Sequence, residues 1–298
     1  MAGWEGLLLI DKPSGPTSHD VVDRVRKATG QRRVGHAGTL DPLASGLLPL
    51  VLGRATRLVR FLPRSPKCYE GSLRLGLSTT TDDITGEVRE KHVGSLPDSE
   101  RVLVQAASLV GEQLQVPPAV SARKVGGRRL YRLARAGVRV EAAPSRVHVF
   151  AFEVESTAEA ATYIFRARVS GGTYIRAMVR DLGAALGCGG VLLSLRRTAI
   201  GPMAPPPGLR LDPKAPPEAG LLKQHLLPLE AMPLEPPAVR LSSPADAQRF
   251  AAGVALPTSS GAAEEGYRRV IDPEGRLLGV AQSSGGLLQP RVVLPPRA

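Results

Sequence analysis

Hydrophobic and polar positions change their spacing several times along the chain, and each change marks a new element. An apolar run at residues 6–10 predicts a first strand, which is closed by a Pro/Gly turn. Valines then recur at helical spacing after Thr17 and Ser18, either of which suits an N-cap, and Gly30 suits a helix end. The sequence therefore predicts a strand, a turn and a helix over residues 6–30.

Later segments alternate between apolar and polar residues with a period of two, which is typical of half-buried strands. They cover residues 67–77, 146–154 and 161–169. In the first of them Tyr69 falls on the apolar face and Glu70 on the polar face. A tyrosine on an apolar face is usually a core residue, so this position alone does not indicate a function.

After the last of these strands the chain passes two glycines and shows helical spacing from Arg176 onward. Tyr174 and Arg176 are two positions apart, so they face the same way if this stretch is extended. A further amphipathic helix is expected within residues 97–111. Helices interspersed with strands favour an α+β body.

The C-terminal part of the chain has a different pattern. It follows a proline-rich stretch at residues 233–241 and reads as short strands separated by turns, one of them at residues 250–257. Residues 273–275, Pro-Glu-Gly, suit a hairpin-type connection. We therefore expect a large domain, which contains the candidate chemistry, over residues 1–232 and a small β-rich domain over residues 233–298.

Composition narrows the class of protein. The chain has 298 residues, of which 43% are hydrophobic, enough for a substantial core. Its formal net charge of +12 indicates a polyanionic partner, although charge alone does not choose between nucleic acid and an anionic membrane. The N-terminal apolar run is too short for a membrane span and is followed at once by Asp11 and Lys12, so no membrane association is expected.

Motifs for cofactors are missing from the sequence. Cys68 and Cys188 lie far apart without a CxxC pattern, which predicts neither a disulfide framework nor a zinc site and fits a reduced cytoplasmic setting. There is no GxxxxGK[ST] and no GxGxxG that follows a strand and opens a helix. We expect no metal and no cofactor.

The stretch GHAGTLDPLASG, residues 35–46, contains the main candidate for chemistry, Asp41. An aspartate before a proline in a glycine-containing loop most often forms a turn. Alternatively, the glycines let the backbone approach a bulky ligand while Pro42 fixes the position of the acid. A carboxylate in such a cleft needs a nearby cation to stay charged, and Arg176 is the candidate.

Two further features admit both a structural and a functional interpretation. His36 is either a structural histidine or a planar side chain that stacks on a base. The basic segment at residues 128–135, which starts with Arg128 and Arg129 and includes Tyr131, is either a solvated helix face or a phosphate-binding surface.

Five segments together resemble the TruB-type tRNA pseudouridine synthases. They are LLIDKPSGPTSHDVV, VGHAGTLDPLASGLLPL, KCYEGSLRLGLSTTTDD, SARKVGGRRLYRLARAG and GGTYIRAMVRDLGAALGCGG…LRRT, in that order over residues 8 to about 198. The resemblance implies a pseudouridine synthase fold with a mixed, largely antiparallel central sheet flanked by helices and loops. The C-terminal stretch resembles the small PUA-like RNA-binding domain of that family.

The resemblance also implies the reaction. Uridine 55 in the T arm of tRNA is flipped out, its C1′–N1 bond is cleaved, the base rotates, and a C1′–C5 bond forms without a cofactor. Asp41, in the Gly-Thr-Leu-Asp-Pro motif, would be the essential aspartate, which either attacks C1′ or removes the 2′ hydrogen. Tyr69 would stack on the base, and Arg176 would pair with Asp41.

The same resemblance implies a set of substrate-binding residues. Among them, Asp83 would help to position the flipped nucleotide and His36 would insert into the T loop. The complete expected set is Lys12, His36, Lys67, Asp83, Arg128, Arg129 and Tyr174.

Three alternatives stay open at this point. A dyskerin-type synthase, directed by a guide RNA and partner proteins, shares the catalytic motifs. A non-catalytic RNA-binding or tRNA-folding protein would use Asp41 only as a structural residue. DNA binding is the weakest alternative, because there is no helix-turn-helix or zinc-finger pattern. We expect a monomer whose partner is tRNA.

Overall fold

The computed structural model describes residues 3–121, 124–125, 128–129, 142–258 and 265–294. No helix in these ranges is long and apolar enough to span a membrane.

Within the described residues, eight strands form one mixed sheet. Their order is β1-β3-β12-β4-β11-β10-β7, with β2 paired to β3. β12 is parallel to β3, and the other paired neighbours are antiparallel, which confirms the predicted α+β fold. The strands are β1 (Gly6–Lys12), β2 (Val34–His36), β3 (Ser45–Leu52), β4 (Lys67–Leu75), β7 (Gly111–Gln115), β10 (Ser145–Ser156), β11 (Thr162–Val169) and β12 (Gly190–Ile200).

The described residues also form short helices and two small strand pairs. The helices are α1 (Ser18–Thr29), α2 (Ser99–Ala107), α4 (Ile175–Ala185), α5 (Ala219–Gln224) and α6 (Pro244–Ala251), with 3-10 turns at η1 (Gly53–Phe61) and η2 (Leu229–Ala231). The strand pairs are β5 (Leu77–Thr79) with β6 (Val88–Lys91), and β8 (Lys124–Val125) with β9 (Arg128–Arg129).

Helix α1 begins and ends as its sequence predicts. Thr17 is the N-cap of a capping box with Asp20, and Gly30 ends the helix in the left-handed conformation. Its buried face, Val21, Val22 and Val25, packs into the same core as one face of β1 and β3. The helix is therefore fixed at both ends and along one side.

Strand β3 is apolar along nearly its whole length because both of its faces are buried. Leu48 and Leu50 face the core that contains α1, whereas Leu47 and Val51 face η1 and the C-terminal part of the chain. The strand that follows the Asp41 loop is thus anchored on both sides.

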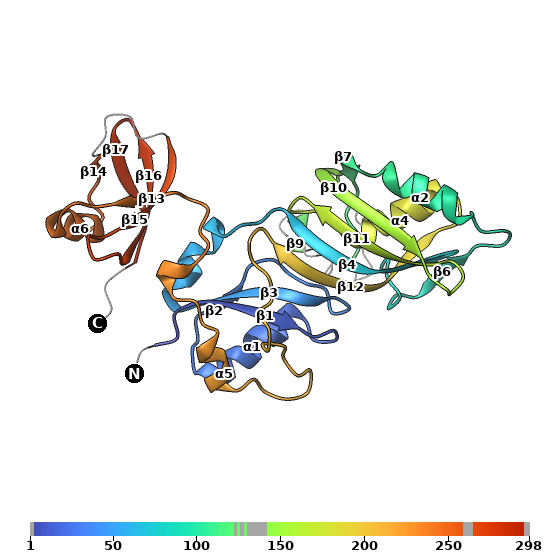
Figure 1. Ribbon diagram of the computed structural model, residues 1–298, viewed down its shortest axis with the longest axis horizontal. Helices are drawn as coiled ribbons and strands as arrows, with labels where there is room; N and C mark the ends of the chain where they lie inside the picture. The colour runs from blue at the N-terminus through green and yellow to red at the C-terminus, as the bar shows by residue number, and fades with distance from the viewer. Residues whose placement is uncertain (1–2, 122–123, 126–127, 130–141, 259–264, 295–298) are drawn as a thin grey trace.

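The alternation along β4 is confirmed. Tyr69 and Leu73 are buried in the core that also contains residues of α2 and α4, and Glu70 is exposed on the other face of the sheet. In Figure 1 both helices lie on the same side of β10 and β11. The part of the central sheet around β4, β10 and β11 therefore has one helix-covered face and one open face.

A second sheet forms at one end of the molecule, beyond η1 (Figure 1). In the described residues its order is β13-β15-β16-β17-β14. The strands are β13 (Ala238–Arg240), β14 (Leu256–Pro257), β15 (Gly266–Ile271), β16 (Leu277–Ser284) and β17 (Leu287–Val293).

Expectations for this C-terminal part are met in one place and fail in another. The Pro-Glu-Gly turn at residues 273–275 connects β15 and β16 as predicted. The prediction of a strand over residues 250–257 is wrong in its first half, because Phe250 lies in helix α6. The Phe250 ring packs in the core of this sheet. The boundary between residues 232 and 233 stays a prediction.

Candidate active site

Asp41 lies in the loop between β2 and β3, and helix α1 holds that loop in place. The Ser18 hydroxyl, at the start of α1, donates to the Leu40 carbonyl at 3.0 Å and accepts from the Leu40 amide at 2.8 Å. The Asp41 carbonyl accepts from the Ala44 amide at 3.1 Å. The turn thus uses the backbone of Asp41 and leaves the carboxylate for other contacts.

The carboxylate forms an ion pair with Arg176. Arg176 Nε donates to Asp41 Oδ2 at 2.9 Å. The remaining nitrogens of the guanidinium donate to the carbonyls of Thr81 at 2.7 Å and Val120 at 2.9 Å. Arg176 is buried, whereas 41% of the Asp41 side chain is exposed. The acid therefore faces the solvent, and its counterion is fixed behind it.

Arg176 lies in the first turn of α4, which Tyr174 precedes as the N-cap residue. The helix predicted from Arg176 onward is therefore confirmed, and the extended alternative for this stretch is wrong. The buried Gln115 side chain from β7 pairs with the Tyr174 backbone, accepting from its amide at 2.8 Å and donating to its carbonyl at 3.1 Å. The sequence analysis missed Gln115, because its role depends on a contact 59 residues away.

A cavity of about 210 Å³ brings many of the expected residues together. Its size suits a single nucleobase better than a larger ligand. The lining residues are Thr39, Leu40, Asp41, Ala44, Lys67, Tyr69, Gly172, Thr173, Tyr174, Ile175, Arg176 and Leu195. Leu195, from β12, is a lining residue that the sequence analysis did not identify.

Two titratable side chains of this cavity are shifted by burial. Burial raises the pKa of the Tyr69 phenol, although Arg197 opposes this, so the hydroxyl stays protonated. Burial lowers the pKa of Lys67 to about 8, and the charges of Arg197 and Arg64 add to the effect. Lys67 is thus a cation at neutral pH that loses its charge in mildly alkaline solution.

Asp83 lies behind the site and does not line the cavity formed by the described residues. Its carboxylate accepts from the Thr81 hydroxyl at 2.8 Å and from the Thr85 amide at 3.0 Å. It also lies 3.7 Å from Arg176 Nε. In this conformation Asp83 supports Arg176 rather than facing the place of a nucleotide.

Lys12 is completely buried and does not offer its ammonium to a ligand at the surface. Its Nζ donates to the carbonyls of Pro13 at 2.9 Å and Pro16 at 2.8 Å. Burial lowers its pKa to about 8, an effect that the charge of Asp41 opposes. A direct contact with RNA, as expected from the resemblance, would need an exposed ammonium.

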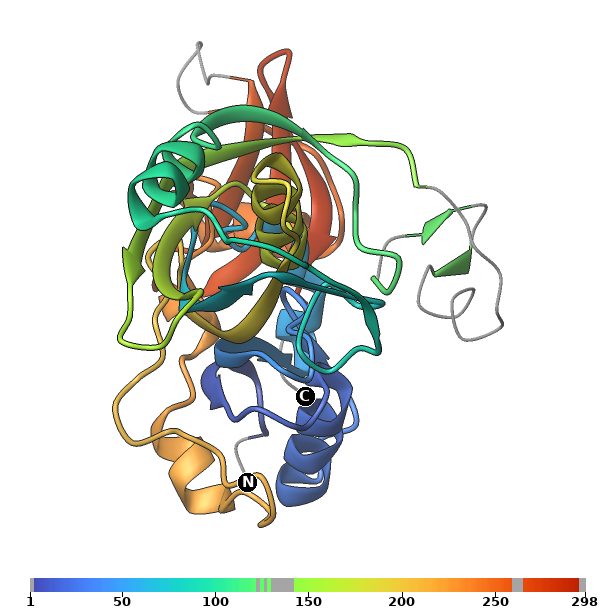
Figure 2. The same ribbon diagram turned by 90° about the vertical axis from the view of Figure 1, so that its right-hand side faces the viewer.

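The remaining expected binding residues are His36, Arg128 and Arg129. His36 is half-buried at the end of β2, directly before the Asp41 loop. Arg128 and Arg129 form strand β9, not a helix face, and the β8–β9 pair stands away from the central sheet (Figure 2). Their side chains, and residues 130–135 of the same basic segment, lie outside the described part of the structure.

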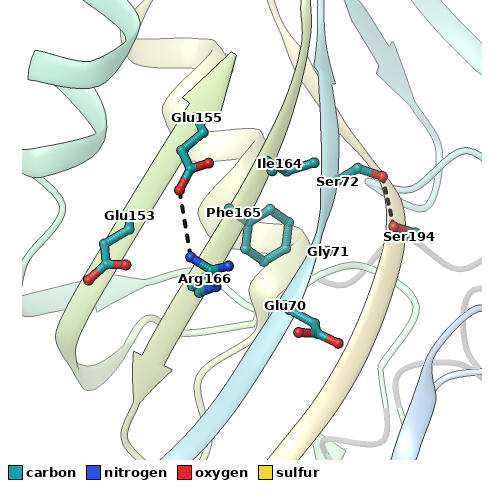
Figure 3. Close-up of a pocket in the computed structure, with 9 residues that line it drawn as sticks. All are labelled: Glu70, Gly71, Ser72, Glu153, Glu155, Ile164, Phe165, Arg166 and Ser194. Atoms are coloured by element: carbon teal, nitrogen blue, oxygen red, sulfur yellow. Dashed lines mark hydrogen bonds and ion pairs between the residues drawn. The ribbon is translucent and has the colours of Figure 1, made fainter. Parts of the chain in front are cut away.

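A second cavity, of about 330 Å³, lies on the open face of the central sheet (Figure 3). Glu70 and Ser72, which alternate with Tyr69 along β4, line it together with Glu155 and Arg166. It contains none of the residues for which the sequence predicts chemistry. The candidate chemistry is therefore confined to the face that carries Tyr69.

The class of protein follows from comparison with known families. Residues 26–175 match the TruB family pseudouridylate synthase N-terminal domain, and residues 237–294 match the C-terminal domain of pseudouridine synthase II TruB. The chain is therefore an enzyme of the pseudouridine synthase class. It belongs to the TruB family, as the resemblance of its motifs indicated.

Curated relatives match over almost the full length. The tRNA pseudouridine synthase B of Thermobifida fusca (strain YX) is 43% identical, with 97% of this chain and 98% of the relative covered. The tRNA pseudouridine synthase B of Burkholderia mallei (strain NCTC 10247) is 42% identical, with 96% and 95% covered.

Solved structures share the fold. The crystal structure of a Cbf5-Nop10-Gar1 complex contains a chain that is 25% identical, with a TM-score of 0.70 and with 98% of this chain and 86% of that chain covered. A structure of an H/ACA RNP bound to a substrate RNA containing 2'-deoxyuridine gives the same TM-score at 23% identity, covering 99% and 86%.

Proposed function

We propose that this enzyme converts uridine 55 in the T arm of tRNA to pseudouridine, with Asp41 as the essential residue. The observation that carries the proposal is the Asp41 carboxylate, exposed at the mouth of a nucleobase-sized cavity and held at 2.9 Å by a buried arginine. The relatives at about 40% identity, which are named tRNA pseudouridine synthase B, support tRNA as the substrate.

The reaction is an isomerisation that requires a flipped uridine. Unstacking the base costs a few kcal/mol, which contacts in the cavity must offset. The C1′–N1 bond breaks, the base rotates, C5 bonds to C1′, and the C5 proton is exchanged for a proton on N1. Asp41 acts on the ribose, either by attacking C1′ or by removing the 2′ hydrogen. Tyr69, on the cavity wall, stacks on the uracil.

The remaining residues hold the RNA or the catalytic pair. Lys67 and Tyr174 line the cavity and contact the flipped nucleotide. His36, Arg128 and Arg129 contact the T arm outside the cavity. Lys12 and Asp83 support the loops on which Asp41 and Arg176 depend, as their burial and backbone contacts indicate.

The proposed setting is a reduced cytoplasmic location, in which Cys68 and Cys188 are free thiols. The enzyme acts as a monomer in this proposal.

The test uses the purified protein and an unmodified tRNA transcript with no other component. Pseudouridine is mapped by its carbodiimide adduct and reverse transcription, and a transcript with cytidine at position 55 is the matched control. We expect one pseudouridine per tRNA, at position 55, and none in the control transcript. Pseudouridine at another position, or none, contradicts the proposal.

The likeness to the Cbf5 complex makes a guide-dependent enzyme the second candidate. The same experiment separates the two, because a guide-dependent enzyme makes no product until guide RNA and partner proteins are added. A non-catalytic tRNA-binding protein would bind the transcript and leave its uridines unchanged under both conditions.

A further inference from the structure

Arg197 lies where the two strands that carry the candidate chemistry meet. On β12 it pairs in the parallel direction with Gly46 of β3 and in the antiparallel direction with Tyr69 of β4. The β12–β4 register shifts directly after Arg197. This single position of the sheet therefore neighbours both the end of the Asp41 loop and the Tyr69 phenol.

The Arg197 side chain binds both ends of the Asp41 loop. Its Nε donates to the Leu47 carbonyl at 2.8 Å, and its Nη2 donates to the Gly38 carbonyl at 2.9 Å. The remaining terminal nitrogen, Nη1, lies 3.4 Å from the Thr39 carbonyl. The rigid, planar guanidinium thus spans the two sides of the loop at once.

The loop is built to let this contact form. Gly46 has a φ of +96°, and a Cβ atom there would lie 2.2 Å from the Arg197 carbonyl. Gly38 has a φ of +90°, and a Cβ atom there would lie 3.5 Å from Arg197 Nη1. The conformation and the close approach at Gly46 both require glycine.

Arg197 is fully buried. In the described part of the chain it has no carboxylate as an ion-pair partner. Burial lowers its pKa, and the neighbouring Tyr69 opposes this. A buried cation without an ionic partner is costly, so it is expected only where its hydrogen bonds are needed. Here those bonds go to the two sides of the Asp41 loop.

We propose that Arg197 is a positioning residue, which fixes the Asp41 loop in one geometry for the reaction, at the point of the sheet where the loop lies next to Tyr69. Arg197 is not among the described residues that line the cavity, so it acts through the loop and does not touch the substrate. The inference rests on the proposed function.

The test compares Arg197→Lys and Arg197→Gln with the wild type and with Arg166→Gln. Arg166 is a matched control, because it belongs to the same sheet, its side chain is 70% exposed, and it points to the open face (Figure 3). Lysine keeps the charge but lacks the planar fork, so it cannot reach Gly38 and Leu47 together.

The measurements are the single-turnover rate on bound tRNA, the Kd for tRNA, thermal unfolding, and amide hydrogen exchange over residues 37–47. In Arg197→Lys we expect the rate per folded molecule to fall about 100-fold and the Kd to change less than about threefold. Exchange should accelerate in residues 37–47 and not in the C-terminal sheet. Arg166→Gln should match the wild type in all four.

The outcomes separate this inference from the proposed function. If the wild type makes no pseudouridine in tRNA, the proposed function fails. If it does and Arg197→Lys reacts at the wild-type rate, or lowers the rate and the affinity equally, the positioning role is wrong. A loss of folding in both variants also overturns it, since Arg197 would then be required for the core alone.

Discussion

At the scale of single residues, the two partners of the ion pair in the site differ in their exposure to solvent: Arg176 is buried and the Asp41 side chain is partly exposed. Arg176 is 4% exposed, and three carbonyl or carboxylate partners satisfy its guanidinium, so its desolvation is compensated. Asp41 keeps much of its surface in contact with the cavity. Such a fixed cation orients the acid without occupying the space that a ribose needs.

Lys67 gives the site a pH dependence that can be measured. Because burial lowers its pKa to about 8, its ammonium is largely lost at about pH 9. A hydrogen bond from a charged donor is worth about 1.5 kcal/mol or more, so the Kd for tRNA should rise up to about tenfold between about pH 7 and pH 9. Fluorescence anisotropy with labelled tRNA at constant salt measures this change.

The matched control is Lys67→Gln, which should bind weakly at both pH values and show a smaller change. The free energy of unfolding should move in the opposite direction to the affinity. Between about pH 8 and the ordinary lysine pKa of 10.5, the unfolded chain binds more protons than the folded one, so stability from this group rises with pH. An affinity that depends equally on pH in both proteins would show that Lys67 does not contact the RNA.

At the scale of elements, helix α1 and the Asp41 loop act as one unit through Ser18. The Ser18 hydroxyl is buried and serves both the amide and the carbonyl of Leu40, the residue before Asp41. A single side chain therefore couples the position of the helix to that of the Asp41 loop.

Replacing Ser18 by alanine should affect both stability and catalysis. It leaves two backbone groups of Leu40 without this partner, and each such loss costs about 1–3 kcal/mol, so we expect the free energy of unfolding to fall by about 3 kcal/mol. The loosened loop should lower the single-turnover rate about tenfold or more. Urea unfolding and the rate on bound tRNA are the measurements.

Thr17→Ala is the control for this prediction, since Thr17 caps the same helix without contacting the loop. It should cost about 1 kcal/mol of stability and leave the rate unchanged. If both variants lower the rate in proportion to their loss of stability, Ser18 acts only through the helix.

The sequence predicts elements well where one local signal decides them. The capping box and Gly30 determine the bounds of α1, and the period of two determines which face of β4 carries Tyr69. Helical spacing from Arg176 onward likewise predicts α4, which begins one residue earlier, at Ile175. The contact of Gln115 with the Tyr174 backbone is not predictable in this way, because Gln115 lies on another strand.

The candidate site is harder to predict where burial decides the role. Lys12 and Asp83 belong to motifs of the family. Only the fold shows that the Lys12 ammonium is hydrogen-bonded to backbone carbonyls and the Asp83 carboxylate to a hydroxyl group of an adjacent loop. Arg197 and Leu195 lie among residues of the same types in β12, so the sequence does not distinguish them from their neighbours. Their positions behind and beside Tyr69 depend on the β4–β12 register, which no local pattern contains.

At the scale of the whole molecule, the C-terminal sheet is joined to the central sheet through η1. Leu277, Val280 and Val292 belong to a hydrophobic cluster that contains Phe61 of η1 and extends to Leu47 of β3. Phe61 also forms an edge-to-face ring contact with Tyr267, with 5.1 Å between ring centroids. The C-terminal sheet thus packs on η1, which in turn packs on the strand that follows the Asp41 loop.

The net charge of +12 also acts at this scale. It draws a polyanion toward the molecule without determining where the reaction occurs. Under the proposed function, specificity for one uridine comes from the cavity beside Asp41, because charge alone attracts every phosphate equally.

The most direct test of the central claim is the single-turnover conversion of prebound tRNA by Asp41→Asn. Asparagine keeps the size of the side chain and removes its charge, so tRNA binding and thermal unfolding should stay close to those of the wild type. The account predicts no detectable pseudouridine from this variant under conditions in which the wild type converts all of the bound tRNA. Turnover at a wild-type rate would contradict it.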